Sequence, residues 1–286
     1  MARCEVCFRK CEISEGGTGF CGARINKGGK IEAKNYGKVS SLALDPIEKK
    51  PLKRFYPGSR ILSVGSFGCN LRCPFCQNHE ISWSRAAMLG GDAAEYLPPE
   101  QLAELARQYR GRGNIGVAFT YNEPLVGYEY VRDTARLVHE RGMKNVLVTN
   151  GTASLPVLEE LAPYIDAMNI DLKGFTDRYY TEVLKGSRQM VLDFIKAAVR
   201  ECHVEVTCLV VPGENDSEEE LLSLCRFLSG LTDGDGNRVG RKIPLHISRF
   251  FPRFHMTDRE ATDVELIYHL AQLARSELDH VYTGNC

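Results

Sequence analysis

The sequence has no long apolar run, no internal repeat, no low-complexity tract and only one tryptophan in 286 residues. No stretch approaches the roughly 20 apolar residues that span a bilayer, and the first residues lack the apolar core of a secretory signal. Acidic and basic residues nearly balance, with a net charge of −1 and no basic stripe of the kind that binds nucleic acid. We therefore expect a cytoplasmic protein that binds neither a membrane nor nucleic acid.

The composition that remains is that of an ordinary folded protein, 43% hydrophobic and 26% charged. This length fits one large α/β domain with a small appendage. Residues 1–58 are rich in Cys, Gly and Lys and carry only short candidate strands, in KIEAKNYG and VSSLAL. We predict that they form a Cys-rich N-terminal extension and connector, and that residues 59–286 form the main domain.

Apolar strand-like runs alternate with amphipathic helical stretches along the main domain. The predicted strands are 60–68, 114–121, 144–151, 166–174, 203–213 and 244–250, with a short one in DHVYTGN near the end. The predicted helices are 98–110, 125–142, 154–163, 187–201, 217–229 and 260–277. Strands separated by helices indicate βαβ units and a parallel sheet. Both an open, partial (β/α)6 TIM-type barrel and a doubly wound sheet fit this number of units.

The direction of side chains along these strands favours the partial barrel. Parallel strands covered by helices on both faces are apolar throughout, whereas polar residues here recur at every second position. The polar residues that share a strand face in this way are Asn169, Asp171, Lys173, Glu205, Thr207, His246 and Ser248. A polar interior suits a barrel that encloses a polar ligand. An internal ion-pair network that holds the barrel together is the alternative, because buried charges need partners.

Eleven cysteines in a reducing compartment indicate metal binding or catalysis rather than a disulfide framework. Cys69, Cys73 and Cys76, in SFGCNLRCPFCQN, follow the first predicted strand at its C-terminal end, where barrel enzymes keep their reactive groups. Three thiolates hold three corners of a [4Fe–4S] cluster and leave one iron open to an exogenous ligand. A zinc site or free thiols are the alternatives, although structural zinc usually takes four ligands.

A second group of cysteines lies in the extension with the spacing C-x2-C-x3-C-x9-C. It consists of Cys4, Cys7, Cys11 and Cys21. Four thiolates complete a tetrahedral site for zinc or iron, and they also suit an auxiliary Fe–S cluster. A small extension with few large apolar residues needs such a staple, so we expect a structural role, with electron relay as the alternative. Reduced thiols or a disulfide would leave the extension without metal.

The three-cysteine loop, with Phe75 before its last cysteine, resembles the radical S-adenosylmethionine (radical SAM) superfamily over roughly residues 60–250. The resemblance implies that the amino acid part of SAM chelates the open iron. It also implies that an electron from flavodoxin or ferredoxin cleaves SAM through the cluster, and that the resulting 5′-deoxyadenosyl radical abstracts hydrogen from a substrate.

TYNEP (120–124) resembles the superfamily's Gly-Gly-Glu-Pro-like segment, of which only Glu-Pro is retained. VTNG (148–151) and NIDLK (169–173) resemble the activases of glycyl-radical enzymes. They lie at successive strand ends and, with a late histidine, imply contacts to SAM or substrate. The residues carried over are Asn122, Glu123, Thr149, Asn150, Asp171, Lys173 and His246, to which strand parity adds Glu205 and Thr207. Pyruvate formate-lyase activases have a carboxylate where Val148 stands here, which removes one ligand of their monovalent cation site.

The flanks narrow the resemblance. GFCGAR (19–24), residues 37–58 and YTGNC (282–286) look like the radical SAM component of the AmmeMemoRadiSam system, named for companion Memo-like and AMMECR-like proteins. We expect an activase that takes hydrogen from a glycine of a partner glycyl-radical enzyme. Radical modification of a small molecule, peptide or RNA beside Memo-like partners is one alternative. A non-catalytic Fe–S scaffold is another.

Overall fold

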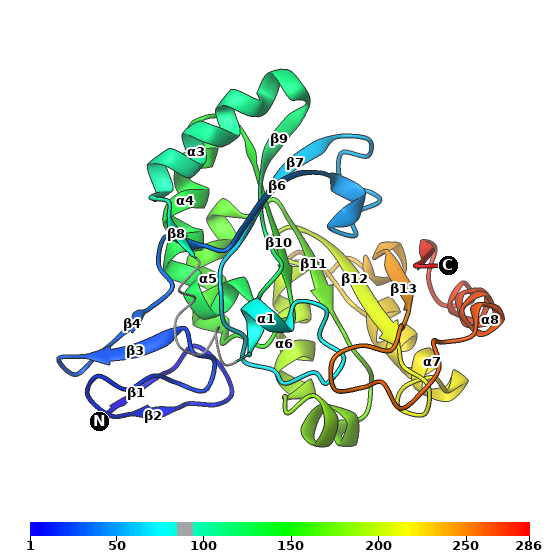
Figure 1. The fold of residues 1–286 in the computed structure, drawn as a ribbon. Helices are drawn as coiled ribbons and strands as arrows, with labels where there is room; N and C mark the ends of the chain where they lie inside the picture. Colours follow the sequence, from blue (N-terminus) through cyan, green and yellow to red (C-terminus); the bar gives the residue numbers. More distant parts are fainter. Residues whose placement is uncertain (85–93) are drawn as a thin grey trace.

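The computed structural model describes residues 1–84 and 94–286. Its centre is an eight-stranded sheet in the order β14-β13-β12-β11-β10-β9-β7-β6. The strands are β6 (Ser41–Pro46), β7 (Arg60–Gly65), β9 (Asn114–Phe119), β10 (Lys144–Thr149), β11 (Ala167–Asp171), β12 (His203–Val210), β13 (Leu245–Arg249) and β14 (Val281–Gly284). From β7 to β14 every pairing is parallel and follows chain order (Figure 1). The prediction of a partial barrel, including its short last strand, is confirmed.

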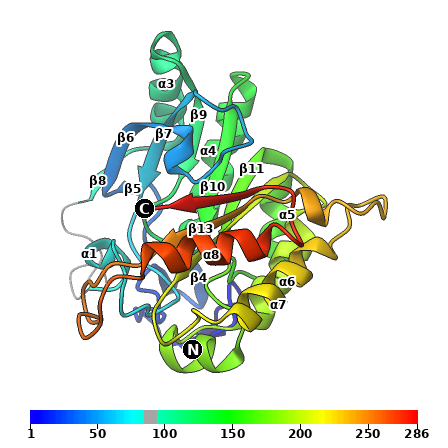
Figure 2. The same ribbon diagram turned by 90° about the vertical axis from the view of Figure 1, so that its right-hand side faces the viewer.

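Helices connect the strands along the outside of the sheet (Figures 1 and 2). They are α3 (Pro99–Gln108), α4 (Tyr128–Glu140), α5 (Leu155–Leu161), α6 (Arg188–Ala198), α7 (Glu218–Ser229) and α8 (Val264–Ala274), with the short α1 (His79–Ser82) after the cysteine loop. Single turns are η1 (Ile47–Lys49), η2 (Tyr109–Arg112), η3 (Pro124–Gly127), η4 (Ala162–Tyr164), η6 (Gly240–Lys242) and the π-helix η5 (Tyr179–Val183). Within the described ranges, no helix is long and apolar enough to cross a bilayer.

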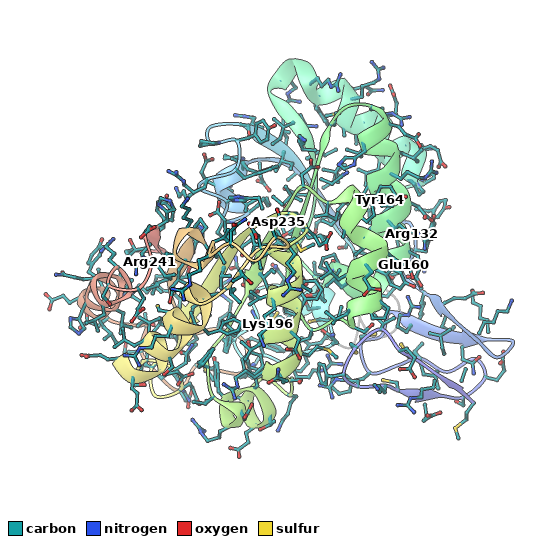
Figure 3. The ribbon with its side chains drawn as sticks, turned by 180° about the vertical axis from the view of Figure 1, so that it is seen from behind. Arg132, Glu160, Tyr164, Lys196, Asp235 and Arg241 are labelled. Carbon is teal, nitrogen blue, oxygen red and sulfur yellow. The ribbon has the colours of Figure 1, made fainter. Side chains whose placement is uncertain are left out.

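Local sequence explains where these helices begin and which side they bury. The Ser217 side chain caps α7 by accepting from the Glu220 amide at 3.2 Å, and glutamates fill the first turn, where the helix dipole favours them. The outer side carries paired charges, and Figure 3 shows Arg132 and Glu160 close together on neighbouring helices, 2.7 Å apart. Exposed pairs contribute at most about 1 kcal/mol, so buried apolar contacts hold these helices to the sheet.

The segment ahead of the main sheet consists of short antiparallel pairs. They are β1 (Ala2–Arg3) with β2 (Glu12–Ile13), β3 (Arg24–Lys27) with β4 (Lys30–Ala33), and β5 (Lys38–Val39) with β8 (Glu95–Tyr96). This N-terminal unit, residues 1–33, contacts the loop after β10, where the Ser154 amide donates to the Val6 carbonyl at 2.8 Å. It therefore lies beside the C-terminal ends of the barrel strands.

The segment of residues 41–59, which leads into β7 and is called the connector below, also contributes to the barrel. β6 pairs antiparallel with β7 along its whole length and forms that edge of the sheet. Beyond β6 the chain turns across the N-terminal strand ends, where Ile47 and Leu52 are fully buried against Ile61 and Ala118. The connector thus fills the barrel interior at the N-terminal strand ends, and the C-terminal strand ends remain available for a site.

Candidate active site

The C-terminal ends of the parallel strands surround one cavity of about 350 Å³. The loop after β7 and the ends of β9, β10, β11 and β12 all reach it. The predicted site residues that line the cavity are Cys69, Cys73, Phe75, Cys76, Asn122, Glu123, Thr149, Asn150, Asp171, Lys173 and Thr207. Residues distant in sequence are therefore collected at the end of the barrel where parallel-sheet enzymes place their chemistry.

The cysteine loop presents three free thiols to this cavity. Burial raises the pKa of Cys73 to about 12 and also raises the pKa values of Cys69 and Cys76, so metal binding must release their protons. Within residues 1–84 and 94–286, no three His, Cys, Asp or Glu side chains surround a single-ion position. A cubane cluster binds its cysteines through separate irons. Three thiols around one cavity thus fit a [4Fe–4S] cluster.

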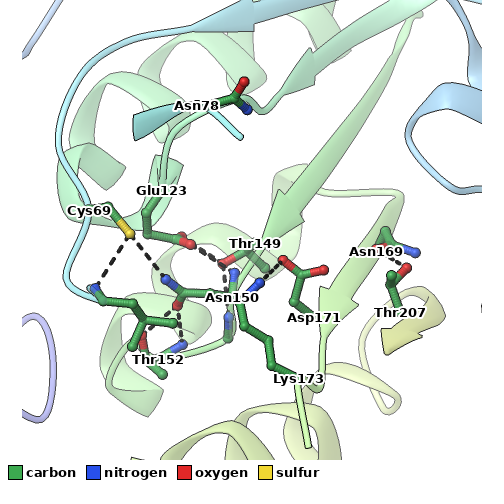
Figure 4. A network of polar contacts seen from close by, with 12 residues as sticks. Cys69, Asn78, Glu123, Thr149, Asn150, Thr152, Asn169, Asp171, Lys173 and Thr207 are labelled. Carbon is green, nitrogen blue, oxygen red and sulfur yellow. Dashed lines mark hydrogen bonds and ion pairs between the residues drawn. The ribbon is translucent and has the colours of Figure 1, made fainter. Parts of the chain in front are cut away.

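Glu123 lies beside the cysteine loop, in the segment after β9, and its side chain is almost fully buried. Its carboxylate accepts from the Thr149 hydroxyl at 2.6 Å and from the amides of Asn150 and Leu125 at 2.8 and 3.1 Å (Figure 4). Burial raises the pKa of Glu123 to about 7, although the hydrogen bonds from Asn150 and Thr149 oppose the rise. A buried carboxylate held in this way is an acceptor for a cationic ligand group.

The two asparagines of the predicted site hold the cysteine loop in place. The Asn122 side chain donates to the Gly68 carbonyl at 3.1 Å and accepts from the Ser66 amide at 2.9 Å. The Asn150 amide group donates to the Cys69 sulfur at 3.6 Å (Figure 4). Asn122 therefore holds the backbone just before Cys69, and Asn150 contacts the Cys69 sulfur itself.

Asp171 and Lys173 form an ion pair of 2.8 Å at the end of β11. Burial lowers the pKa of Lys173, but Asp171 and the neighbouring Cys73 outweigh it, and the pKa is raised overall. The Lys173 backbone amide also donates to the Tyr180 hydroxyl at 3.0 Å, which fixes the turn after the strand. Figure 4 shows this pair on the far side of Thr149 from Cys69, and both side chains line the cavity.

Thr207 forms the floor of the cavity between β11 and β12. Its hydroxyl donates to the Asn169 side chain at 2.8 Å, and Asn169 in turn donates to the Pro51 carbonyl of the connector at 2.8 Å (Figure 4). Closer to the N-terminal ends of the strands, residues of the connector fill the barrel interior.

The prediction that Glu205 and His246 contact the ligand is not met, because neither lines the cavity. Glu205 is fully buried and accepts from His246 Nε2 at 2.6 Å and from the amides of Lys53 and Arg54 at 2.9 and 2.7 Å. It stands two residues before Thr207 on the same strand face, one interior layer deeper. Glu205 and His246 therefore form a buried hydrogen-bonded pair outside the cavity, whereas Asp171 and Lys173 pair with each other at its wall.

Some lining residues escaped the sequence patterns. Asn78 and Tyr121 line the cavity, and the Asn78 side chain donates to the Tyr121 carbonyl at 2.8 Å. The end of β13, the basic and aromatic segment that follows it and the penultimate residue supply further ones: Arg249, Phe250, Phe251, Arg253 and Asn285. Their position directly after the last long strand was the signal available in the sequence.

The structure also brings the four N-terminal cysteines together. Cys4, Cys7, Cys11 and Cys21 are free thiols that line one small internal void in the N-terminal unit. The backbone supports this arrangement, because the Cys4 amide donates to the Cys11 carbonyl at 2.9 Å.

The chain is similar to proteins of one superfamily. The profile of the "Radical SAM superfamily" matches residues 63–225, more than half of the chain. An uncharacterized protein of Methanocaldococcus jannaschii is 42% identical over 99% of this chain and 81% of its own length. The pyruvate formate-lyase-activating enzyme of Clostridium pasteurianum is 30% identical over 73% of this chain and 87% of its own. Streptococcus suis SuiB shares the fold, with a TM-score of 0.57 at 16% identity, over 78% of this chain and 48% of SuiB.

Proposed function

Because this chain belongs to the radical SAM superfamily, and is a radical SAM enzyme, we propose that it cleaves SAM reductively at a site-differentiated [4Fe–4S] cluster in an activase-like reaction. One electron from flavodoxin or ferredoxin breaks the C5′–S bond of SAM, giving methionine and a 5′-deoxyadenosyl radical that takes one hydrogen atom from the substrate. The observation that carries the proposal is the single cavity shared by the cysteine loop, Glu123 and the Asp171–Lys173 pair.

The residues of this chain divide the work of holding these groups. Cys69, Cys73 and Cys76 would bind three irons of the cluster, and no other cysteine of the described chain lines the cavity. The fourth iron would then be open to the amino and carboxylate groups of SAM. Cys73 is buried and Cys69 and Cys76 are half-buried at the cavity wall, which would limit the contact of the metal with bulk water.

Glu123 is the acceptor we assign to the SAM ammonium group. Thr149 and Asn150 each donate a hydrogen bond to its carboxylate, which orients the two oxygens before a ligand arrives. Such preorganisation lowers the entropic cost of binding. Asp171 and Lys173 line the same cavity, are less buried than Glu123, and would contact SAM on the side where the substrate enters.

A partner protein is the substrate class that we favour. The relative from Clostridium pasteurianum is named for activating pyruvate formate-lyase. The rim of the cavity also carries Phe251, whose side chain is 45% exposed, together with Arg253. An exposed aromatic ring and a guanidinium group at the mouth suit contact with a glycine-bearing segment of a glycyl-radical enzyme.

Two finer assignments complete the proposal. The four N-terminal cysteines would hold zinc or iron, because four thiols line one internal void. The flanking motifs resemble those of the radical SAM component of the AmmeMemoRadiSam system, which would make Memo-like and AMMECR-like proteins candidate partners.

Anaerobic reconstitution followed by SAM and dithionite tests the cleavage. We expect 5′-deoxyadenosine from the native protein and none from Cys73→Ala. Cys202→Ala is the matched control, because that thiol lies outside the cavity and contacts the Ala198 carbonyl on the outer helix. A fully iron-loaded protein that binds SAM yet forms no 5′-deoxyadenosine would contradict the proposal.

A second experiment tests the substrate class. Pyruvate formate-lyase carrying deuterium at the glycine Cα is incubated with the reduced enzyme and SAM, and the mass of 5′-deoxyadenosine is measured. Deuterium in the product supports the activase assignment. Unlabelled product would leave SAM cleavage standing and remove pyruvate formate-lyase as the partner.

A further inference from the structure

The two cysteine groups of this protein meet at one buried interface. The void lined by Cys4, Cys7, Cys11 and Cys21 is also lined by Asn70, which stands between two residues of the three-cysteine loop. Asn70 is 1% exposed, so the N-terminal unit and the loop are packed without solvent between them at this point.

One guanidinium group at the four-thiol void has a buried N–H donor without an acceptor. Arg24 lines it and is only 4% exposed, yet its Nε has no hydrogen-bond partner among the described residues. Its NH1 group donates to the Glu129 carboxylate at 2.7 Å and to the Val126 carbonyl at 3.4 Å. A buried N–H without an acceptor is rare and calls for a missing partner. A metal-bound thiolate is an acceptor of this kind.

Charge supports the same assignment. Four thiolates around a divalent ion leave a net charge of −2, which is costly inside a protein without counter-charges. Arg9 and Arg24 both line the void. The two guanidinium groups would offset part of that charge, in addition to the bonds that Arg9 donates to the Asn70 carbonyl and Arg24 to Glu129.

The backbone of the cysteine loop lies directly on this unit. Gly68, which precedes Cys69, has a φ of +96°, and a Cβ placed there would lie 2.7 Å from the Cys21 carbonyl oxygen and 2.8 Å from the Ala23 Cβ. Only glycine permits so close an approach. One ligand of the four-cysteine group therefore abuts the residue before the first ligand of the other.

Side chains extend this contact to the Cys69 sulfur. Arg9 Nε donates to the Asn70 carbonyl at 2.9 Å. The Asn70 side chain accepts from Asn150 at 3.0 Å, and the same Asn150 amide group donates to Cys69 Sγ at 3.6 Å. A continuous path of hydrogen bonds thus leads from the N-terminal unit to a sulfur of the active-site cavity.

A pair of guanidinium groups holds the other side of the loop. The Phe20 ring lies against both Arg9 and Arg72, at 3.3 and 3.8 Å from their guanidinium carbons. Arg72 NH1 donates to the Cys69 carbonyl at 2.8 Å. Phe20 directly precedes Cys21, so the fold of the four-cysteine group determines where this ring stands.

The four thiols line this void without surrounding a single-ion position, so a bound ion must draw them together. We propose that zinc or iron does so in a tetrathiolate centre, and that this centre positions Cys69 of the radical cluster through Arg9 and Asn70. The second half of the proposal rests on the proposed function, because it needs the cluster. Arg9 and Asn70 are positioning residues, since they reach the cluster only through Cys69 and Asn150.

The metal centre is tested without the cluster. A variant with Cys69→Ala, Cys73→Ala and Cys76→Ala is purified anaerobically, loaded separately with zinc and with ferrous iron, and desalted. We expect one metal per chain, and none after Cys21→Ala is added. A folded triple variant that retains neither metal would overturn the assignment, whether or not the native protein cleaves SAM.

Folding of the triple variant is checked by circular dichroism. Should it fail to fold, X-ray absorption at zinc, or Mössbauer spectroscopy of iron, counts the ligands of the second metal in the native protein. Four sulfur neighbours are expected, and fewer sulfur neighbours would overturn the tetrathiolate centre.

The positioning role is tested with Arg9→Lys and Asn70→Ala in the reconstituted enzyme. Residues that orient a metal ligand change metal affinity by about 10- to 100-fold, so we expect iron loss to a chelator to be about tenfold faster. The electron paramagnetic resonance spectrum of the reduced cluster should also shift. Arg3→Lys is the control, because Arg3 lies in the same unit but pairs only with the exposed Glu5 at 2.9 Å.

Native-like spectra and chelation rates in both variants would overturn the positioning role. A native protein that holds no cluster would instead contradict the proposed function, and the metal content of the triple variant would remain interpretable. A second metal that changes oxidation state with dithionite would assign electron relay to the centre in place of a purely structural role.

Discussion

The Tyr121 hydroxyl donates a 2.8 Å hydrogen bond to the Asp45 carboxylate, which joins the cavity wall to β6, the strand of the connector. The same carboxylate oxygen accepts from Lys50 Nζ at 2.8 Å, and Lys50 is 2% exposed. Burial raises the pKa of Asp45, but Lys50 and Tyr121 outweigh it and bring the value to about 2. The connector therefore supports one wall of the cavity through a buried charge.

Separate replacement of Lys49 and Lys50 compares the stability contribution of an exposed ion pair with that of a buried one. Lys50→Met leaves Asp45 without its main partner, and loss of one member of a buried pair costs about 3–5 kcal/mol of unfolding free energy. Lys49 reaches the same carboxylate only at 3.7 Å and its side chain is 69% exposed. Lys49→Met should therefore change stability by about 0.5 kcal/mol or less. Equal urea midpoints for the two variants would contradict the buried pair.

Glu205 predicts a defined acid response. Burial raises its pKa, but His203, His246 and the amides of Lys53 and Arg54 outweigh it and bring the value to about 2, below the ordinary 4.5. A carboxylate with a lowered folded-state pKa stabilises the native state above its unfolded-state pKa and loses that contribution as the pH falls through the folded-state value. The contribution should be complete above pH 4.5 and decline towards pH 2.

Urea unfolding of Glu205→Gln between pH 7 and pH 3 measures this response. At pH 7 the variant should be less stable by about 3 kcal/mol, because buried donors lose their acceptor. The difference from the native protein should narrow below pH 4.5. Glu104→Gln is the control, since Glu104 pairs with Arg107 on the surface and should matter little. A gap that is constant with pH would contradict the charged state of Glu205.

Thr149→Val tests the preorganised carboxylate. The change removes the 2.6 Å hydrogen bond to Glu123 and keeps the shape of the side chain. Hydrogen bonds to charged groups contribute about 1.5–3 kcal/mol, so the Kd for SAM should rise by about tenfold or more. Anaerobic calorimetry on the iron-loaded protein provides the measurement. Thr181→Val, which alters an exposed hydroxyl bound to the Asp177 carbonyl, should leave the Kd unchanged.

Two glycines with positive φ isolate the contact between the cysteine loop and the N-terminal unit. Gly58 has a φ of +82°, and the place that an alanine Cβ would take has no other atom within 4 Å, so Gly58→Ala should cost only the backbone term of about 1–2 kcal/mol. Gly68→Ala adds a collision with Cys21 and Ala23 and should cost more than about 3 kcal/mol. Thermal unfolding compares them, and equal losses would show that the interface yields easily.

Strand parity predicted which side chains face the interior because the direction of side chains alternates strictly along a strand. Asp171, Lys173 and Thr207 accordingly line the cavity. Parity carries no information on depth along the barrel axis, and Glu205 shows the consequence. It has the same parity as Thr207 yet lies in the layer that the connector covers.

Contacts between distant segments were beyond the sequence patterns. The short run VSSLAL was recognisable as a strand, but nothing local indicated that β6 pairs with β7. Asn70 looks like any polar loop residue between two cysteines, and its importance comes from Arg9 and Asn150, which approach it from distant parts of the chain.

The buried connector has a consequence for the order of events in catalysis. Ile47 and Leu52 fill the interior at the N-terminal strand ends, so in the described part of the chain the cavity is approached from the opposite end. A site with one entrance imposes an order of binding, because the molecule that binds deepest must arrive first and leave last. Under the proposed function, SAM would enter before a macromolecular substrate, and methionine and 5′-deoxyadenosine would leave only after that substrate has withdrawn. Turnover would be set by how fast the partner dissociates, and excess partner would inhibit its own modification.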